Sequence, residues 1–303
     1  MSDRRTTFSI EVFPPKNDTP VESIYSTLDG LSGIAPDFIS CTYGAGGNGT
    51  KNATIDICRV ISENYHIPSV AHLTCVNSAR EDIDEVIAQL RENHIDSVLA
   101  LRGDRNPNIE PKDDFHHASE LIAYLRENAP ELHISAACYP ETHVDSRSAV
   151  TDIYYMKEKE SCGAERFISQ LFFNNDDYYE FLEKTQIAGI KSPIEAGIMP
   201  VTSKKSVMRM ISICGASLPK KLTRILNKYE DDPESLREAG IAYAIGQISD
   251  LIANDVDGIH LYAMNKPDIA QQIYSAVRNQ LSSRPSRARV QLLREPRTVN
   301  AQI

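Results

Sequence analysis

The chain has 303 residues, of which 41% are hydrophobic and 24% charged, a composition typical of a globular protein with one large domain or two modest ones. Its formal net charge of −10 argues against a general nucleic-acid-binding protein, because neutralising phosphates requires basic patches. Its six cysteines include no C-x-x-C pair, which argues against a zinc knuckle or a dense disulfide framework and favours reduced thiols in a cytoplasmic protein.

Short runs rich in β-branched residues alternate with longer helix-periodic segments. The eight runs expected as strands lie at residues 8–13, 37–43, 69–74, 96–101, 133–138, 166–171, 193–199 and 258–262. Between the third and fourth runs, the residues Ile83, Val86, Ile87 and Leu90 share one helical face. Eight strand–helix units close a parallel barrel, so the predicted fold is α/β, a (β/α)8 TIM barrel. The long interval 200–257 leaves room for extra helices before the last strand.

The barrel is expected to form one catalytic domain over residues 1–281. Residues 282–303 carry five arginines against one glutamate, which predicts a mobile basic tail, with a partner-binding arm as the alternative. No uncharged run approaches the roughly 18 residues of a membrane helix, and the first residues lack the apolar core of an export signal. We therefore expect a cytoplasmic protein without a membrane anchor.

A glycine loop follows the second predicted strand. Gly44, Gly46 and Gly49 match the G-x-G-x-x-G spacing of a dinucleotide-binding loop. That motif requires the first strand of a βαβ unit and an acidic residue about 20 positions on, whereas the strand after this loop contains no Asp or Glu. Two other interpretations stay open: a flexible strand–helix turn, or an active-site loop whose backbone approaches a ligand closely.

Glu11 occupies a strand position where a barrel should be apolar. Phe8, Ile10 and Val12 share one face of the first strand, so the alternation places Glu11 on the opposite face, inside the barrel near its upper rim. A buried carboxylate is costly unless it is paired or functional, and an apolar environment favours the protonated form that a proton donor needs. A salt-bridged core glutamate is the structural alternative.

Other polar residues lie at the ends of further strands. Asp104 directly follows the fourth strand, where a catalytic position and a helix cap are equally good interpretations. Gln170 of the sixth strand is expected to face the lumen as an amide that donates and accepts. The chain lacks H-E-x-x-H, a P-loop lysine and G-x-S-x-G, so we expect no metal site and no NTPase or serine esterase chemistry. The same mouth would be encircled by His72, His143, Thr42 and Tyr43.

Eight motifs follow one another along the chain: FSIEVFPPK, ISCTYGAGG, AHLTC, LALRGD, YPETH, ISQLFF, AGIMPV and LYAMNK. From about Phe8 to about Leu281 they resemble the methylenetetrahydrofolate reductase family, bacterial type. The resemblance implies a (β/α)8 barrel with non-covalent FAD, which passes a hydride from NADH or NADPH to 5,10-methylenetetrahydrofolate and yields 5-methyltetrahydrofolate. Because nicotinamide and pterin need the same flavin face, a ping-pong sequence is expected.

The resemblance also implies roles for single residues. Glu11 would be the general acid, Asp104 would bind the pterin and tune the flavin as the second catalytic residue, and Gln170 would contact folate or nicotinamide. Lys266, where arginine is typical, would face the glutamate tail of the folate. The implied flavin contacts are Thr42, Tyr43, Ala45, His72, Arg102, Gly103, Asp104, His117, Tyr139, His143, Asp152 and Lys159.

Some positions depart from the family pattern. Glu158 stands where a basic residue near the FAD phosphates is expected, which leaves Lys159 as the cation there. Tyr155 replaces a small amide, and His117 replaces an aromatic residue. These departures keep two alternatives open: a relative without FAD that transfers hydride directly from nicotinamide, and a non-catalytic folate-binding subunit of a one-carbon complex. We expect a homo-oligomer with small-molecule substrates, and a ferredoxin or partner subunit is an alternative source of electrons.

Overall fold

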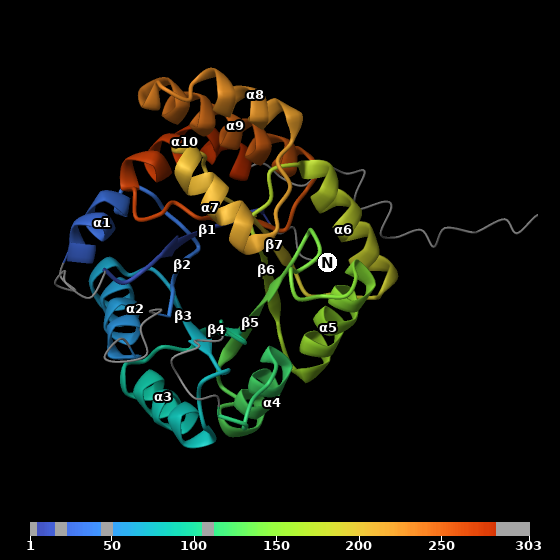
Figure 1. Ribbon diagram of the computed structural model, residues 1–303. Helices are drawn as coiled ribbons and strands as arrows, with labels where there is room; N and C mark the ends of the chain where they lie inside the picture. Colours follow the sequence, from blue (N-terminus) through green and yellow to red (C-terminus); the bar gives the residue numbers. More distant parts are fainter. Residues whose placement is uncertain (1–4, 16–22, 44–50, 105–111, 283–303) are drawn as a thin grey trace, which may run out of the picture.

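Eight parallel strands close into a barrel in which each strand pairs with its neighbours in sequence and β8 returns to β1. The computed structural model describes residues 5–15, 23–43, 51–104 and 112–282. Within this part of the chain, the predicted (β/α)8 architecture is confirmed, and Figure 1 shows the helices arranged around the strands. The strands are β1 Thr7–Val12, β2 Phe38–Cys41, β3 Ser69–Thr74, β4 Ser97–Leu101, β5 His133–Cys138, β6 Arg166–Ser169, β7 Ile194–Ile198 and β8 Gly258–Leu261.

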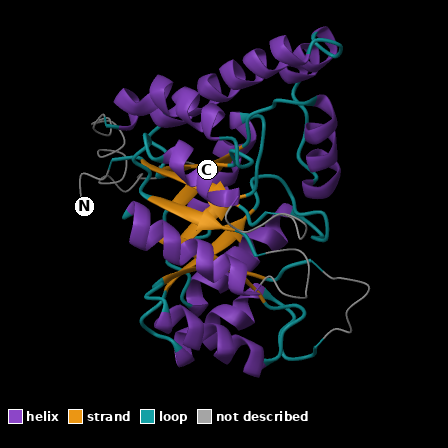
Figure 2. Cartoon of the chain, turned by 90° about the vertical axis from the view of Figure 1, so that its left-hand side faces the viewer, coloured by secondary structure: helices purple, strands orange, loops and turns teal. Residues whose placement is uncertain are grey.

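The helices follow the strands in alternation and form the outer layer, as the side view in Figure 2 shows. Extra helices precede β8 as predicted, because α8 and α9 are added after the helix that completes the seventh unit. None of the helices in the described ranges is long and apolar enough to cross a bilayer. The helices are α1 Ser23–Leu31, α2 Lys51–Tyr65, α3 Arg80–Glu92, α4 Ala118–Asn128, α5 Ala149–Cys162, α6 Asn175–Ile187, α7 Lys204–Cys214, α8 Lys220–Lys228, α9 Pro233–Ala253 and α10 Pro267–Leu281.

The main core lies between the strands and the helices. Phe8, Ile10 and Val12 of β1 are all buried in it, and the Phe8 ring packs against Tyr274 of α10 with their centroids 5.4 Å apart. A second apolar layer, formed by Phe38, Val70, Leu99 and Ile168, comes from four different strands and is separate from the main core. Side chains therefore alternate between the helix layer and the lumen, as the period of two predicts.

Helix α9 packs unusually closely against the segment that follows β7. A Cβ atom added at Gly240 would lie 1.6 Å from the carbonyl oxygen of Val201, so this helix position requires the absence of a side chain. Gly246, six residues further along α9, has no heavy atom within 4 Å of a Cβ atom added there. The close approach at Gly240 fixes the distance between α9 and the carboxyl end of β7.

One asparagine links the segments that follow the first and last strands of the barrel. Asn265 follows β8, and its side chain accepts a hydrogen bond from the Phe13 amide at 3.1 Å and donates to the Phe13 carbonyl at 2.8 Å. Met264 and Asn265 both adopt left-handed backbone conformations, with φ of 56° and 53°. This turn directs the chain from the barrel mouth into α10.

The glycine loop at residues 44–50, including Ala45, and the predicted tail beyond Ser282 lie outside the described residues.

Candidate active site

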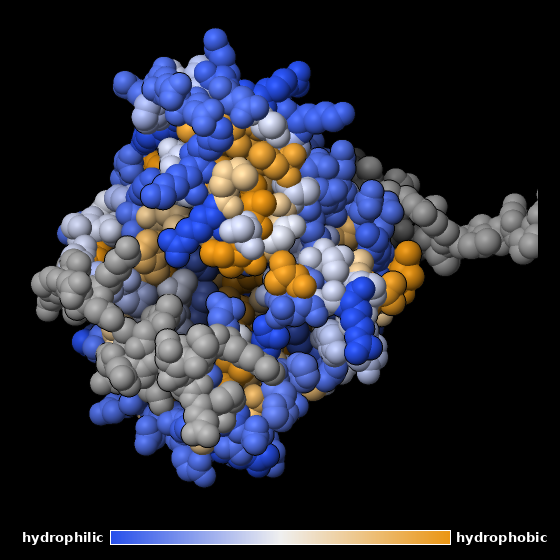
Figure 3. Space-filling view, viewed as in Figure 1, coloured by the Kyte–Doolittle hydropathy of each residue, from blue (hydrophilic) through white to orange (hydrophobic). Residues whose placement is uncertain are grey.

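A cavity of about 1090 Å³ opens at the carboxyl ends of the strands, the end where barrels of this kind carry their active sites. Figure 3 shows the face with this hollow, where hydrophobic and hydrophilic residues lie side by side around the opening. Its volume is at the upper end of the range for small-molecule and cofactor sites. The predicted site residues that line it are Glu11, Thr42, Tyr43, His72, Arg102, Gly103, Asp104, His117, Tyr139, His143, Asp152, Lys159 and Gln170.

Glu11 lies on the lumen face of β1, as the alternation predicts, between two imidazole rings. Its Oε2 atom is 3.6 Å from Nε2 of His72 and 3.9 Å from Nε2 of His260. Burial lowers the pKa of His72 to about 4, although Glu11 acts in the opposite direction, so His72 is neutral at neutral pH. The contact between them is therefore no salt bridge under those conditions, which argues against the structural alternative for Glu11.

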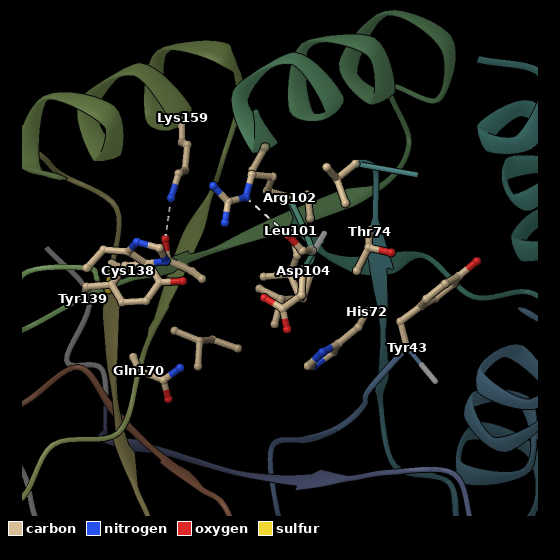
Figure 4. Close-up of a pocket in the computed structure, with 18 of the residues that line it drawn as sticks. Tyr43, His72, Thr74, Leu101, Arg102, Asp104, Cys138, Tyr139, Lys159 and Gln170 are labelled. Carbon is tan, nitrogen blue, oxygen red and sulfur yellow. Dashed lines mark hydrogen bonds between the residues drawn. The ribbon is translucent and has the colours of Figure 1, made fainter. Parts of the chain in front are cut away.

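His72 also presents an unsatisfied buried atom to the cavity. Its side chain is only 6% exposed, and among the described residues Nε2 has no hydrogen-bond partner. A buried polar atom without a partner is costly, so a ligand atom at this position would remove the penalty. Figure 4 shows the His72 ring directed toward the space that Asp104 and Gln170 also face.

Asp104 reaches the cavity through a glycine turn. Gly103 has φ of +84°, and a Cβ atom there would lie 2.9 Å from Cβ of Thr74, so a glycine is required. The N-cap residue of α4 is His117, and Asp104 therefore does not cap that helix. Arg102 donates from Nη2 to Oδ2 of Asp145 at 3.0 Å. This segment thus places a cation and a carboxylate side by side on the cavity wall.

Lys159 and its neighbours form the opposite wall. Nζ of Lys159 donates to the carbonyl of Ala137 at 2.7 Å. Burial lowers the pKa of Lys159, and the nearby Asp152 and Glu158 carboxylates offset this in part. Asp152 itself accepts a hydrogen bond from the amide of His143 at 2.9 Å, which ties α5 to the segment after β5. The wall combines a partly buried cation with a fixed loop.

Aromatic rings border the same wall. His117 stacks on Tyr155 with centroids 5.9 Å apart, and Tyr139 meets the His143 ring edge-on at 4.5 Å. Burial raises the pKa of Tyr139 to about 12, so its hydroxyl stays protonated and can donate. Such rings and hydroxyls suit a flat ligand with polar edges.

Two predicted folate contacts have different surroundings. Gln170 follows β6 directly instead of lying within it, and its Oε1 accepts a hydrogen bond from the Leu171 amide at 2.8 Å, which fixes the side chain at the cavity. Lys266 lies outside the cavity lining of the described residues, and its Nζ donates to Oγ1 of Thr202 at 3.1 Å. The sequence reasoning did not include Tyr262 and Met264, which also line the cavity, although both follow β8 and the strand-end rule would have found them.

One family is found when the chain is compared with known proteins. The family model described as Methylenetetrahydrofolate reductase matches residues 1–278. The chain belongs to this family. The family expected from the eight motifs is therefore confirmed.

Relatives in the methylenetetrahydrofolate reductase family are known from bacteria and plants. The 5,10-methylenetetrahydrofolate reductase of Pectobacterium carotovorum is 32% identical over 285 residues, which cover 94% of this chain and 93% of the relative. The enzyme of the same name from Escherichia coli K12 is 30% identical over 265 residues, which cover 88% of this chain and 88% of the relative. The Arabidopsis thaliana protein "Methylenetetrahydrofolate reductase (NADH) 1" is 32% identical, but this chain spans only 46% of its length.

The fold recurs in a solved structure of low sequence identity. An uncharacterised protein from Clostridium thermocellum, described as binding two copies of 5-methyl-5,6,7,8-tetrahydrofolic acid, matches with a TM-score of 0.62 and 16% identity. The match covers 92% of this chain and 96% of that one. At this identity the likeness shows the shared barrel fold.

Proposed function

We propose that the protein reduces 5,10-methylenetetrahydrofolate to 5-methyltetrahydrofolate, with FAD as the bound cofactor and NADH or NADPH as the electron donor. The observation that carries the proposal is the convergence of Glu11, Asp104 and Gln170, which lie near or just beyond the carboxyl ends of three different strands, on one cavity of about 1090 Å³. Membership of the family and coverage of nearly the whole Pectobacterium relative support the same reaction. The Arabidopsis relative is named for NADH, which favours NADH as the donor.

The residues of the cavity fit a flavin. The unsatisfied Nε2 atom of His72 is available to a polar edge of a ligand, and Lys159 and Arg102 supply positive charge for its phosphates. FAD, when bound, supplies hydride transfer between the nicotinamide and the folate. The other proposed holding residues are Thr42, Tyr43, Gly103, His117, Tyr139, His143 and Asp152.

Side chains of the protein supply a proton, a negative charge and a contact that orients the substrate. Opening the imidazolidine ring of the folate requires a proton on the departing ring nitrogen, and Glu11 is the carboxyl group placed to give it. The Asp104 carboxylate stabilises the cationic iminium carbon that results. Gln170 orients the substrate through its amide. One cavity for both substrates supports a ping-pong order, in which the nicotinamide leaves before the folate enters.

Anaerobic mixing tests the proposal directly. Purified, flavin-replete protein is mixed with NADH or NADPH and then with methylenetetrahydrofolate, while flavin absorbance is followed. We expect bleaching in the first step and recovery in the second. Bleaching without recovery would contradict folate reduction.

A direct transfer without FAD is the second candidate function. The stacked pair His117 and Tyr155 lies on the cavity wall at two positions that depart from the family pattern, and these rings favour this candidate. Freshly purified protein without visible flavin absorbance, yet active with nicotinamide and folate, would establish it.

Lys159→Gln is expected to weaken FAD binding roughly ten- to hundredfold, because a charge-assisted contact to a phosphate is lost. Quenching of flavin fluorescence during titration of the apoprotein measures the dissociation constant. Lys184→Gln is the matched control, because this lysine is exposed on α6 and pairs only loosely with Glu180 at 3.8 Å. Equal affinities of the two variants would remove Lys159 from the cofactor site.

Asp104→Asn is expected to weaken folate binding roughly tenfold, because the amide no longer stabilises a cation. The midpoint potential of the bound flavin should become less negative, since one negative charge is removed from the cavity wall. Folate titration and a redox titration measure the two effects. Asp113→Asn, an exposed aspartate before α4, is the control, and an unchanged potential together with unchanged folate affinity would exclude the assigned role.

A further inference from the structure

A row of buried polar groups crosses the barrel lumen beneath Glu11. Glu195 of β7 is 1% exposed, and its Oε2 lies 2.6 Å from Oγ of Ser9. The same Ser9 oxygen lies 2.7 Å from Nδ1 of His260, which is fully buried on β8. Nε2 of His260 in turn faces Oε2 of Glu11 at 3.9 Å. The order is therefore Glu195, Ser9, His260 and Glu11.

Packing in the barrel leaves room for the Glu195 carboxylate and fixes the His260 ring. A Cβ atom at Gly258 would lie 2.0 Å from Oγ1 of Thr7 and 2.7 Å from Cγ of Glu195, so only glycine leaves room for the carboxylate. The His260 ring is held between Phe38, which stacks on it at 6.0 Å, and Tyr262, which meets it edge-on at 5.1 Å. The ring orientation, and with it the position of both ring nitrogens, is therefore fixed by packing.

The far end of the row carries a permanent cation. Nε of Arg166 lies 3.4 Å from Oε1 of Glu195, and Oγ1 of Thr7 donates to the same oxygen at 3.1 Å. Burial raises the pKa of Glu195, whereas Arg166, His260 and the two hydroxyl donors act against this rise. Because a permanently charged guanidinium lies beside Oε1 and the Thr7 and Ser9 hydroxyls are placed to donate to the two oxygens, we infer from these contacts that Glu195 is a carboxylate, which only accepts hydrogen bonds.

The hydrogen bonds along the row then have one direction. Ser9 has a single hydroxyl proton, and it donates this proton to Glu195. The Ser9 oxygen can then only accept from Nδ1–H of His260. A neutral imidazole with a proton on Nδ1 has a bare lone pair on Nε2, the atom that faces Glu11.

We propose that Glu195, through Ser9, holds His260 in the Nδ1–H tautomer, so that a bare Nε2 lone pair, and no N–H donor, faces the Glu11 carboxyl and favours the proton-bearing form that the proposed reaction uses. Glu195, Ser9 and His260 are positioning residues and touch no substrate. The tautomer follows from the contacts alone, whereas its use in catalysis rests on the proposed function.

Three other titratable groups, His72, Cys41 and Tyr262, interact with Glu11. Burial lowers the pKa of His72 to about 4 and raises the pKa values of Cys41 and Tyr262 well above their ordinary values, so all three are neutral at neutral pH. None of these three groups therefore supplies a cation that would hold Glu11 ionised. Oγ of Ser40 lies 3.5 Å from Nε2 of His260, closer than Oε2 of Glu11 at 3.9 Å, and can also donate to that lone pair.

The tautomer is tested by ¹⁵N NMR of FAD-loaded protein labelled at its eight histidines, with His260→Gln identifying the His260 signals. We expect a protonated Nδ1 and a bare Nε2 in the parent protein. In Glu195→Gln the amide oxygen must face Arg166 and Thr7, so the NH2 group donates to Ser9 and the tautomer should switch to Nε2–H. Ser9→Ala is the milder second variant and should remove the preference. Ser135→Ala, another buried serine on β5, is the control.

A pH profile of flavin reoxidation by methylenetetrahydrofolate supplies the second readout. In Glu195→Gln the alkaline limb should move roughly one pH unit lower, with a roughly tenfold slower rate on that limb and a near-normal rate at acidic pH. A parent protein with Nε2–H, an unchanged tautomer in the variant, or an equal loss of rate at every pH would overturn the inference. If the tautomer switches as expected but the parent protein does not reduce the folate, the proposed function fails and the assignment of His260 stands.

Discussion

Glu11→Gln is expected to slow reduction of methylenetetrahydrofolate about 10²- to 10⁴-fold while leaving reduction of the flavin by the nicotinamide donor intact. Glutamine matches the shape of Glu11 but has no proton to give to the departing ring nitrogen, and a general acid contributes a factor of this size. The nicotinamide step requires no such proton. Single-turnover absorbance measurements separate the two half-reactions.

The control for this experiment is a substitution that keeps an acid at the same place. Glu11→Asp retains the carboxyl but withdraws it from the two imidazole nitrogens at 3.6 and 3.9 Å, so its rate should lie between those of the parent protein and Glu11→Gln. Equal survival of both half-reactions in Glu11→Gln would show that another group is the acid.

Gly240→Ala is expected to destabilise the fold by about 3 kcal/mol or more, because the new Cβ would meet the Val201 carbonyl oxygen at 1.6 Å. This oxygen belongs to the backbone, which cannot turn aside as a flexible side chain can. Helix α9 must therefore move away from the segment after β7. Equilibrium unfolding in urea measures the loss of unfolding free energy, as a lower urea concentration at the midpoint of the transition with an unchanged slope of free energy against urea.

The same helix contains its own control. Gly246→Ala has open space around the added methyl group, and alanine favours a helix interior over glycine by up to about 1 kcal/mol. This variant should therefore be slightly more stable than the parent protein. Similar midpoints for the two variants would show that α9 does not lie at the distance described.

The barrel could be predicted because the sequence patterns that indicate its strands and helices are local. Strand parity follows from alternation, and Phe8, Ile10 and Val12 lie on the buried helix-facing side as expected. The position of Asp104 at the mouth follows from the rule that carboxyl ends of parallel strands meet at one end. Both inferences require only the order of strands and no long-range contact.

The rest of the site depends on contacts between distant strands. Glu195 interrupts the apolar pattern of β7 as Glu11 does that of β1, yet only the fold shows that it meets Ser9. The strand-end rule alone does not tell where a side chain goes beyond a turn. Two successive left-handed residues precede Lys266, and its amine bonds to Thr202 instead of lining the cavity. Its role toward the folate tail stays a prediction.

The closure between Phe13 and Asn265 joins positions 252 apart in sequence. During translation, Glu11 is made early, whereas β8 and its His260 are made near the end of synthesis. For most of that time the nascent chain therefore lacks the strand that places His260 beside Glu11. The pocket becomes competent only after β8 emerges from the ribosome and docks against β1, so premature termination before residue 258 would leave a protein with no finished site.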